Sequence, residues 1–236
     1  DDLVETLLEQ QPTSVAFDAS AFNMHPGDGF VLLATTRLGE LLEIDVDAGT
    51  VRRLGQSDTK GGVTPGWTGI IRDSMGVIYT SSRIGSDGRV ETCPNFHGRT
   101  TCTHLYTIGP TGLLTADLGS SGLAHMSDID VFEGTIFGSV FDATTTLGYL
   151  VSFDIDPVTV PAVATEVGFF STATSALAYQ SGFYLGHGGI SVDPTDGTIW
   201  GIEQRLTWGP PGPGPRLFKI DRITGENSAA VEVKIE

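Results

Sequence analysis

The hydrophobic and polar positions of this chain follow one pattern that occurs four times. A glycine precedes a short apolar run, and a second run follows, built of leucine, an apolar residue, a variable residue and isoleucine or phenylalanine. The glycines, at intervals of 47, 58 and 63 residues, are Gly29, Gly76, Gly134 and Gly197. The leucines that open the second run are Leu41, Leu105, Leu150 and Leu217. Because turn residues bound these short runs, the pattern predicts pairs of adjacent β-strands.

A further short run stands before and after each pair, so each repeat contains four predicted strands. The outer runs begin at Ser14, Gly69, Asp128 and Ile190 before the pairs, and at Val51, Leu113, Ala162 and Ser228 after them. Four strands are the composition of a β-propeller blade, and known propeller repeats are about 40 to 50 residues long. We therefore predict an all-β, propeller-like fold with four blades, at residues 12–57, 67–119, 126–168 and 189–236.

Two segments stand outside this pattern. Residues 3–8 fit either a short helix or, preferably, a further strand that closes the last blade or pairs with another chain. Residues 169–189 alternate like a strand pair and could be an extra hairpin or part of another blade. Because no linker separates the repeats, we expect one domain over residues 1–236.

Several of these units resemble known proteins. The segments LLEIDVDAGT, LVSFDIDPVT and LFKIDRITG, and the hairpin SVDPTDGTIWGI, are similar to units of bacterial secreted β-propellers of the broad quinoprotein-like and lactonase-like type. The resemblance implies the fold only, because such propellers include lyases, lactonases, dehydrogenases and binding proteins. Most of them have six or seven blades. Four visible repeats therefore imply a small propeller, part of a longer chain, or completion by another subunit.

The charge balance excludes some partners. The chain has 13 Lys and Arg against 29 Asp and Glu, a net charge of −16. A basic stripe for nucleic acid is therefore not expected. No apolar run approaches the roughly 18 residues of a membrane-spanning helix, so no membrane span is expected. We predict a secreted location, extracellular or periplasmic, since strong acidity suits such a setting.

Two cysteines lie in the long insertion of the second repeat. We predict a disulfide between Cys93 and Cys102, which agrees with an oxidising compartment. The alternative is a metal site that adds His97 and His104, although this spacing matches no common zinc pattern.

Candidate ligand-binding residues lie where the innermost strands begin. Trp67, His125 and His187 stand near three of these starts, and Asp128 follows His125 closely. Histidine and carboxylate together suit a divalent metal or general acid–base chemistry in an axial pocket. The alternative is that these are ordinary polar residues of loops. We assign no catalytic residue and expect no cofactor, with a divalent metal such as calcium left open.

These observations favour a secreted or cell-surface propeller that acts as a non-catalytic binding or assembly module. We expect a protein partner or self-association, because residues 3–8 supply a strand beyond the four repeats and residues 169–189 are rich in aromatic side chains. The alternative function is a metal-dependent lyase or hydrolase that uses the axial face.

Overall fold

The computed structural model describes residues 12–17, 31–36, 39–56, 67–73, 75–82, 103–120, 126–142, 147–154, 163–169, 185–205, 216–227 and 231–232. Two predictions lie outside these ranges: the strand at residues 3–8 and the disulfide. The extra hairpin predicted for residues 169–189 lies mostly outside them, since only Phe169, the last residue of β12, and residues 185–189, the first of β13, are described. In the described part of the chain, no helix is long and apolar enough to cross a membrane.

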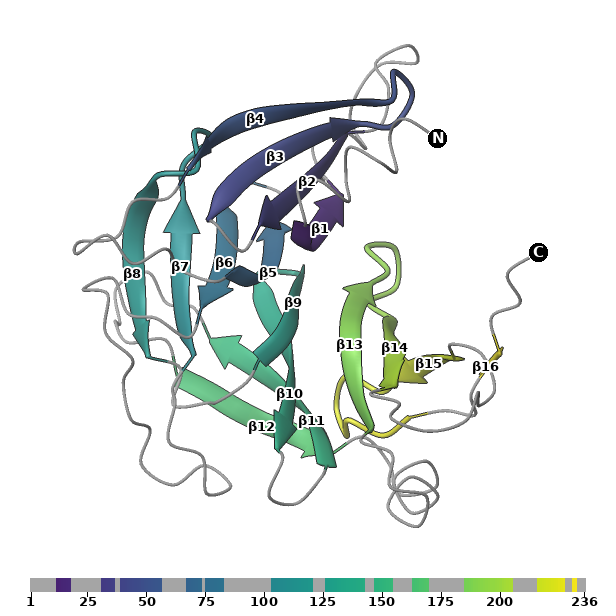
Figure 1. The fold of residues 1–236 in the computed structure, drawn as a ribbon. Coiled ribbons are helices and arrows are strands. Elements are labelled where there is room, and N and C mark those ends of the chain that lie inside the picture. Colours follow the sequence, from purple (N-terminus) through teal and green to yellow (C-terminus); the bar gives the residue numbers. More distant parts are fainter. Residues whose placement is uncertain are drawn as a thin grey trace. The chain divides into compact units, whose positions relative to one another are not determined.

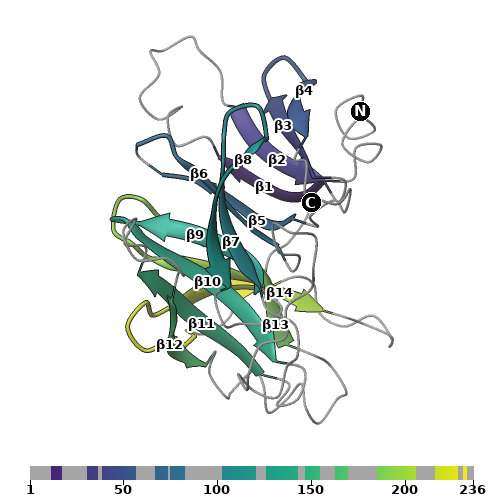
Figure 2. The same ribbon diagram turned by 90° about the vertical axis from the view of Figure 1, so that its left-hand side faces the viewer.

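The described residues form four antiparallel sheets of four strands each (Figures 1 and 2). The first sheet contains β1 (Pro12–Phe17), β2 (Val31–Thr36), β3 (Glu40–Asp45) and β4 (Thr50–Gln56). The second contains β5 (Trp67–Arg72), β6 (Ile78–Ser82), β7 (His104–Ile108) and β8 (Leu114–Ser120). The third contains β9 (Met126–Phe132), β10 (Thr135–Asp142), β11 (Leu147–Asp154) and β12 (Val163–Phe169). The fourth contains β13 (Leu185–Val192), β14 (Ile199–Arg205), β15 (Arg216–Ile220) and β16 (Val231–Glu232).

Strands that are consecutive in the chain are neighbours in every sheet. This order is that of a propeller blade, so the predicted all-β fold with four four-stranded repeats is confirmed. One boundary differs from expectation: β13 begins at Leu185, four residues before the predicted start of the fourth repeat.

The chain divides into two compact units, one holding β1–β8 and the other β9–β16. Within the first unit, β1 and β2 contact β5, and within the second, β9, β10 and β11 contact β13. Each unit therefore has a hydrophobic core between its two sheets. The first core contains Leu33, Leu41, Ile70, Ile78, Tyr106 and Ile108. The second contains Phe137, Leu150, Ile190, Val192, Ile199 and Ile220.

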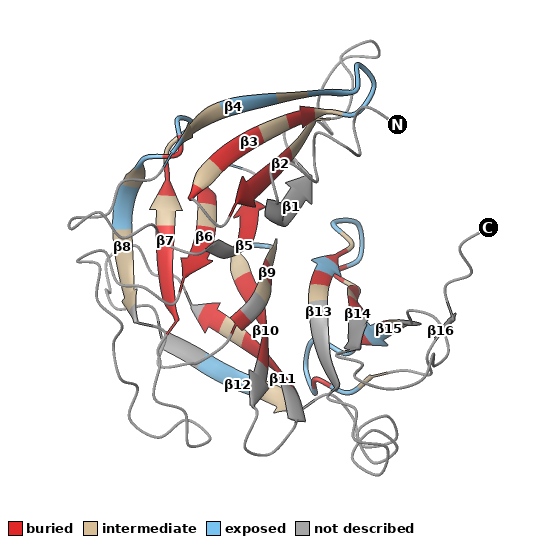
Figure 3. Cartoon of the chain, in the orientation of Figure 1, coloured by how far each residue is buried: buried red, intermediate tan, exposed pale blue. Residues whose placement is uncertain are grey.

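In the first three sheets, burial falls from the middle strands to the described residues of the last strand (Figure 3). In the first sheet, most of β2 and half of β3 are buried, whereas β4 is mostly exposed. Branched and aromatic side chains on the middle strands pack well between two sheets, which is why the apolar runs of the sequence coincide with them.

In each unit, the last strand of the first sheet contacts the second sheet. The contact is made at a β-bulge that is followed by a glycine. In β4, the register shifts opposite Leu41 and Leu42, so that Leu54 is the extra residue and packs against the first core. Gly55 follows it and lies so close to the backbone of Thr111 that a Cβ atom there would overlap the Thr111 carbonyl group. The absence of a side chain therefore sets the distance between these two sheets.

The second unit repeats this contact. In β12 the register shifts opposite Leu150 and Val151, and Val167 packs against the second core. Gly168 follows it and lies against the backbone of Thr224, at the turn between β15 and β16. A bulge, an apolar side chain and a glycine thus form the same sheet-to-sheet contact in both units.

Carboxylates stabilise the tight turns between strands. Asp73 accepts hydrogen bonds from the amides of Met75 and Val77, at 3.0 and 2.8 Å. Asp45 accepts one from the amide of Ala48 at 2.8 Å. Such bonds pair backbone N–H groups that the strands leave unpaired, so these acids serve folding.

Candidate functional site

The first strand of each sheet has a β-bulge close to its start. The bulges fall between Pro12 and Ser14, between Trp67 and Gly69, between Met126 and Asp128, and between His187 and Gly189. Bulges redirect the backbone and occur often beside active sites. The repeated bulge therefore marks one end of each sheet as the candidate site.

Two of the predicted axial residues hold equivalent positions in their sheets. Trp67 and His187 stand directly before their bulges, and Met126 holds the same position in the third sheet. His125 lies outside the described residues, next to Met126. That these side chains converge on one axial pocket stays a prediction.

Small hydroxyl side chains face the bulges from the second strand of the sheet. Thr35 pairs with Ser14, Ser81 with Gly69, and Ser139 with Asp128. The three hydroxyl residues are at most 1% exposed. The sequence analysis did not select them, although the segments ATT, TSS and GSV at the ends of the second strands show the pattern. Buried hydroxyl groups make this end of the sheets polar, as a binding site requires.

Asp128, a predicted ligand, has a structural role in the contact between two sheets. One carboxylate oxygen accepts a hydrogen bond from the amide of Ile129, and the other from the amide of Ile190 on β13, both at 3.0 Å. Burial of the carboxyl group raises the pKa of Asp128 to about 8, although these two amides and their hydrogen bonds oppose the shift. A metal or substrate at Asp128 would have to compete with both amides.

Asp130 makes the same contact two residues further along β9. Its carboxylate accepts hydrogen bonds from the amides of Val131, at 2.7 Å, and of Val192, at 2.6 Å. Burial raises the pKa of Asp130 as well, against hydrogen bonds from these amides and from the side chain of Ser191. The two acids of β9 thus accept hydrogen bonds from backbone amides of β13, the first strand of the next sheet.

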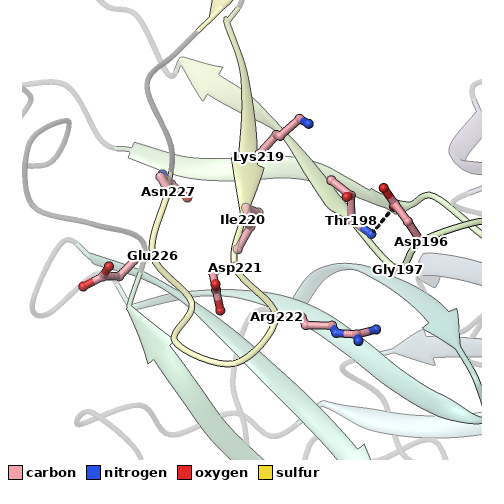
Figure 4. A pocket seen from close by; sticks show the side chains of 9 residues that line it. All are labelled: Asp196, Gly197, Thr198, Lys219, Ile220, Asp221, Arg222, Glu226 and Asn227. Atoms are coloured by element: carbon pink, nitrogen blue, oxygen red, sulfur yellow. Dashed lines mark hydrogen bonds between the residues drawn. The ribbon is translucent and has the colours of Figure 1, made fainter.

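A pocket of about 460 Å³ lies at the turn end of the fourth sheet (Figure 4). Its lining residues are Asp196, Gly197, Thr198, Lys219, Ile220, Asp221, Arg222, Glu226 and Asn227. Asp196 accepts a hydrogen bond from the amide of Thr198 at 2.8 Å, as Figure 4 shows. Hydrogen bonds from backbone amides lower the pKa of both Asp196 and Asp221. The pocket therefore keeps ionised carboxylates at neutral pH.

The cations of this pocket contact aromatic rings. Lys219 Nζ lies 4.9 Å from the centre of the Trp200 ring, and the Arg222 guanidinium lies 5.0 Å from that of Phe132. Such cation–π contacts hold the two side chains over the sheet. The acids of the pocket accept hydrogen bonds from turn amides, and its cations contact aromatic rings. These side chains therefore stabilise the surface here rather than form a selective ion site.

His104 was considered as a metal ligand together with Cys93, His97 and Cys102. Of these four residues, only His104 lies within the described ranges. It is 3% exposed, its Nδ1 lies 3.6 Å from a carboxylate oxygen of Asp117, and its ring stacks on Tyr106. Among the described residues, no group of three or more His, Cys, Asp or Glu could hold a metal ion.

Comparison with known proteins supports the fold and leaves the activity open. No protein-family model matches the chain, and no curated protein sequence matches it either. The chain has a β-propeller-like fold, because each of the four sheets in its described part joins four consecutive strands as a propeller blade does.

An exo-β-1,3-galactanase from Phanerochaete chrysosporium is 15% identical, with a TM-score of 0.55 over 94% of this chain and 50% of that one. A putative exo-β-1,3-galactanase from Bifidobacterium bifidum is 12% identical, with a TM-score of 0.50 over 85% of this chain and 66% of that one. The chain thus spans about half the length of the first of these. At such identities the likeness shows the fold alone.

Proposed function

We propose that the chain is a secreted or cell-surface propeller module that binds a protein partner or a second copy of itself and catalyses no reaction. One observation carries this proposal: the two acids of the described inner strands, Asp128 and Asp130, each accept two backbone hydrogen bonds. An acid in this role is poorly placed to transfer protons or to bind a metal, because it would leave buried amides unpaired.

Light scattering across a concentration series tests the assembly form of this proposal. We expect the average mass to rise above the 24.9 kDa of one chain as the concentration reaches the high micromolar range. A deletion of residues 1–11 should reduce this rise if the predicted N-terminal strand takes part. If the average mass of both proteins stays at that of a single chain, self-association is contradicted and binding to another protein remains. Because the net charge of this chain is −16, such a partner needs a basic or apolar surface.

A metal-dependent lyase or hydrolase is the second candidate. The repeated bulges with buried hydroxyl groups opposite them favour it, because bulges are frequent beside active sites. Metal analysis of the purified chain separates the two. A stoichiometric divalent ion that is lost on substitution of His125 or His187 by alanine would support the enzyme and contradict the non-catalytic module.

A further inference from the structure

The turns that take part in the contact between two sheets contain a glycine of their own. Gly112 and Gly225 have positive φ values of 77° and 73°. A Cβ atom on Gly112 would lie 3.1 Å from the carbonyl carbon of Gly55, and one on Gly225 would lie 2.7 Å from the carbonyl oxygen of Gly168. A side chain at either turn position would therefore push the last strand of the neighbouring sheet away.

The turn between β3 and β4 has the same kind of glycine but no such neighbour. Gly49 has a φ of 64°, close to the values in the other two turns. Apart from its neighbours in the chain, no described atom lies within 4 Å of the place that a Cβ atom on Gly49 would take. Residues 46–50 are all exposed (Figure 3), including Val46, whose exposed fraction is 43%. The first sheet thus presents an uncovered turn of the kind that a glycine of a last strand covers in the second and fourth sheets.

The last strand of the fourth sheet lacks the matching glycine. In the first three sheets, the residue opposite the leucine that opens the third-strand motif is Gly55, Gly119 or Gly168. In the fourth sheet, Val231 pairs with Leu217 at this position. Valine has the Cβ atom that the contact excludes, and Gly55 and Gly168 already lie against turns of their own units. The fourth sheet of a second copy therefore does not fit the uncovered turn.

We propose that the β3–β4 turn is a docking surface for a partner protein, which presents the last strand of a β-sheet with a glycine at the contact position. This inference rests on the proposed binding function and names the surface and the kind of partner for it. The partner's glycine makes room for the turn, as Gly55 and Gly168 do within the chain. Asp45 and Asp47 make the turn acidic, so basic residues beside that glycine would favour docking.

Asparagine at Gly49 tests whether the turn is uncovered in the free chain, because asparagine tolerates a positive φ. In urea unfolding, we expect Gly49→Asn to change the folding equilibrium constant by at most about twofold. Gly112→Asn is the matched control at a similar φ, and it should lower the constant by about tenfold or more, because the first sheet is in the way. Equal losses in the two variants would overturn the proposal, since Gly49 would then be covered by the chain itself.

Val231→Gly turns the chain into a probe for docking, because it places a glycine at the contact position of the fourth sheet. By light scattering, we expect the average mass of this variant to rise at a concentration about tenfold below that of the wild type. Adding Gly49→Asn should abolish the shift. Glu232→Gly is the control, because its glycine falls on the next residue of β16. If Val231→Gly and Glu232→Gly have the same mass at every concentration, or if Gly49→Asn leaves the shift unchanged, the proposal is overturned.

The wild-type mass tests the proposed function, whereas the differences among the variants test the turn, so each can fail alone. If the wild-type chain self-associates and Gly49→Asn abolishes that association, the occupant of the turn is a second copy. That copy would have to use Gly119, and the assignment to a partner protein would be overturned.

Discussion

The glycine that follows each last-strand bulge offers a sharp test of how neighbouring sheets are joined. We consider Gly55→Ala in the first unit. A Cβ atom at this position would overlap the backbone carbonyl of Thr111, and backbone cannot move aside as a flexible side chain does. The two sheets would have to part, which would also withdraw Leu54 from the core that it contacts.

The expected decrease in the free energy of unfolding follows from the steric overlap at Thr111 and from the exposure of Leu54. Forcing an extra methyl group into a packed site costs about 1 to 3 kcal/mol. Partial exposure of Leu54 adds to this, because complete burial of a leucine side chain is worth roughly 1.5 to 3 kcal/mol. We therefore expect Gly55→Ala to lower the free energy of unfolding by about 2 to 4 kcal/mol, a large fraction of the 5 to 15 kcal/mol that is typical of a domain. Gly168→Ala should cost a similar amount, because it meets the backbone of Thr224 in the same way.

Urea unfolding followed by tryptophan fluorescence measures this change. Gly109→Ala provides a matched control, because its Cβ atom would lie 3.4 Å from Thr115 Cγ2 and 3.8 Å from the Leu113 carbonyl, both ordinary contacts. We expect the control to change the free energy of unfolding by less than about 0.5 kcal/mol. If Gly55→Ala and Gly109→Ala have equal effects, close backbone approach does not determine the contact between these sheets.

Three further outcomes can be checked. Thr80→Val removes the buried hydrogen bond from Thr80 Oγ1 to the Gly69 carbonyl (2.7 Å) and should cost about 1 kcal/mol in urea unfolding, whereas Thr80→Ser should cost less. Glu133→Asn should raise the melting temperature slightly, because Glu133 has a φ of 48° in a two-residue hairpin turn, where asparagine is favoured; an unchanged or lower value would show that Glu133 is not strained. Unreduced peptide mass spectrometry should find Cys93 linked to Cys102, a loop worth roughly 2 to 3 kcal/mol, and two free thiols would refute the link.

The sequence alone predicted the strands well because their pattern is local. Apolar runs bounded by Gly49, Gly112 and Gly225 coincide with β3, β7 and β15, and these glycines adopt the positive φ that such turns require. The start of β13 was missed because LGHGG, at its first residues, has the composition of a loop. Glycine in a strand is disfavoured by local propensity, and only pairing with β14 makes the segment a strand.

The candidate site was harder to predict, because its key contacts join distant parts of the chain. The sequence indicated a strand that begins at Asp128 and offered Asp128 as a candidate ligand. Instead these acids accept hydrogen bonds from residues 62 positions further along the chain, a pairing that no local pattern shows. Bulges are equally hidden, since the extra residue is defined by the partner strand and not by its own sequence.

The bulge in each innermost strand has a consequence for how such a chain can change over time. On one side of it, residues such as Ile70 and Ile190 are fixed by the core. On the other, the equivalent positions hold proline, tryptophan, methionine and histidine without any change in the strand pairing that follows. The extra residue separates the two parts of the strand, so the residue type before it can differ while the register after it stays the same. The residue type at these positions could thus diversify one repeat at a time without a change in the pairing that defines each sheet.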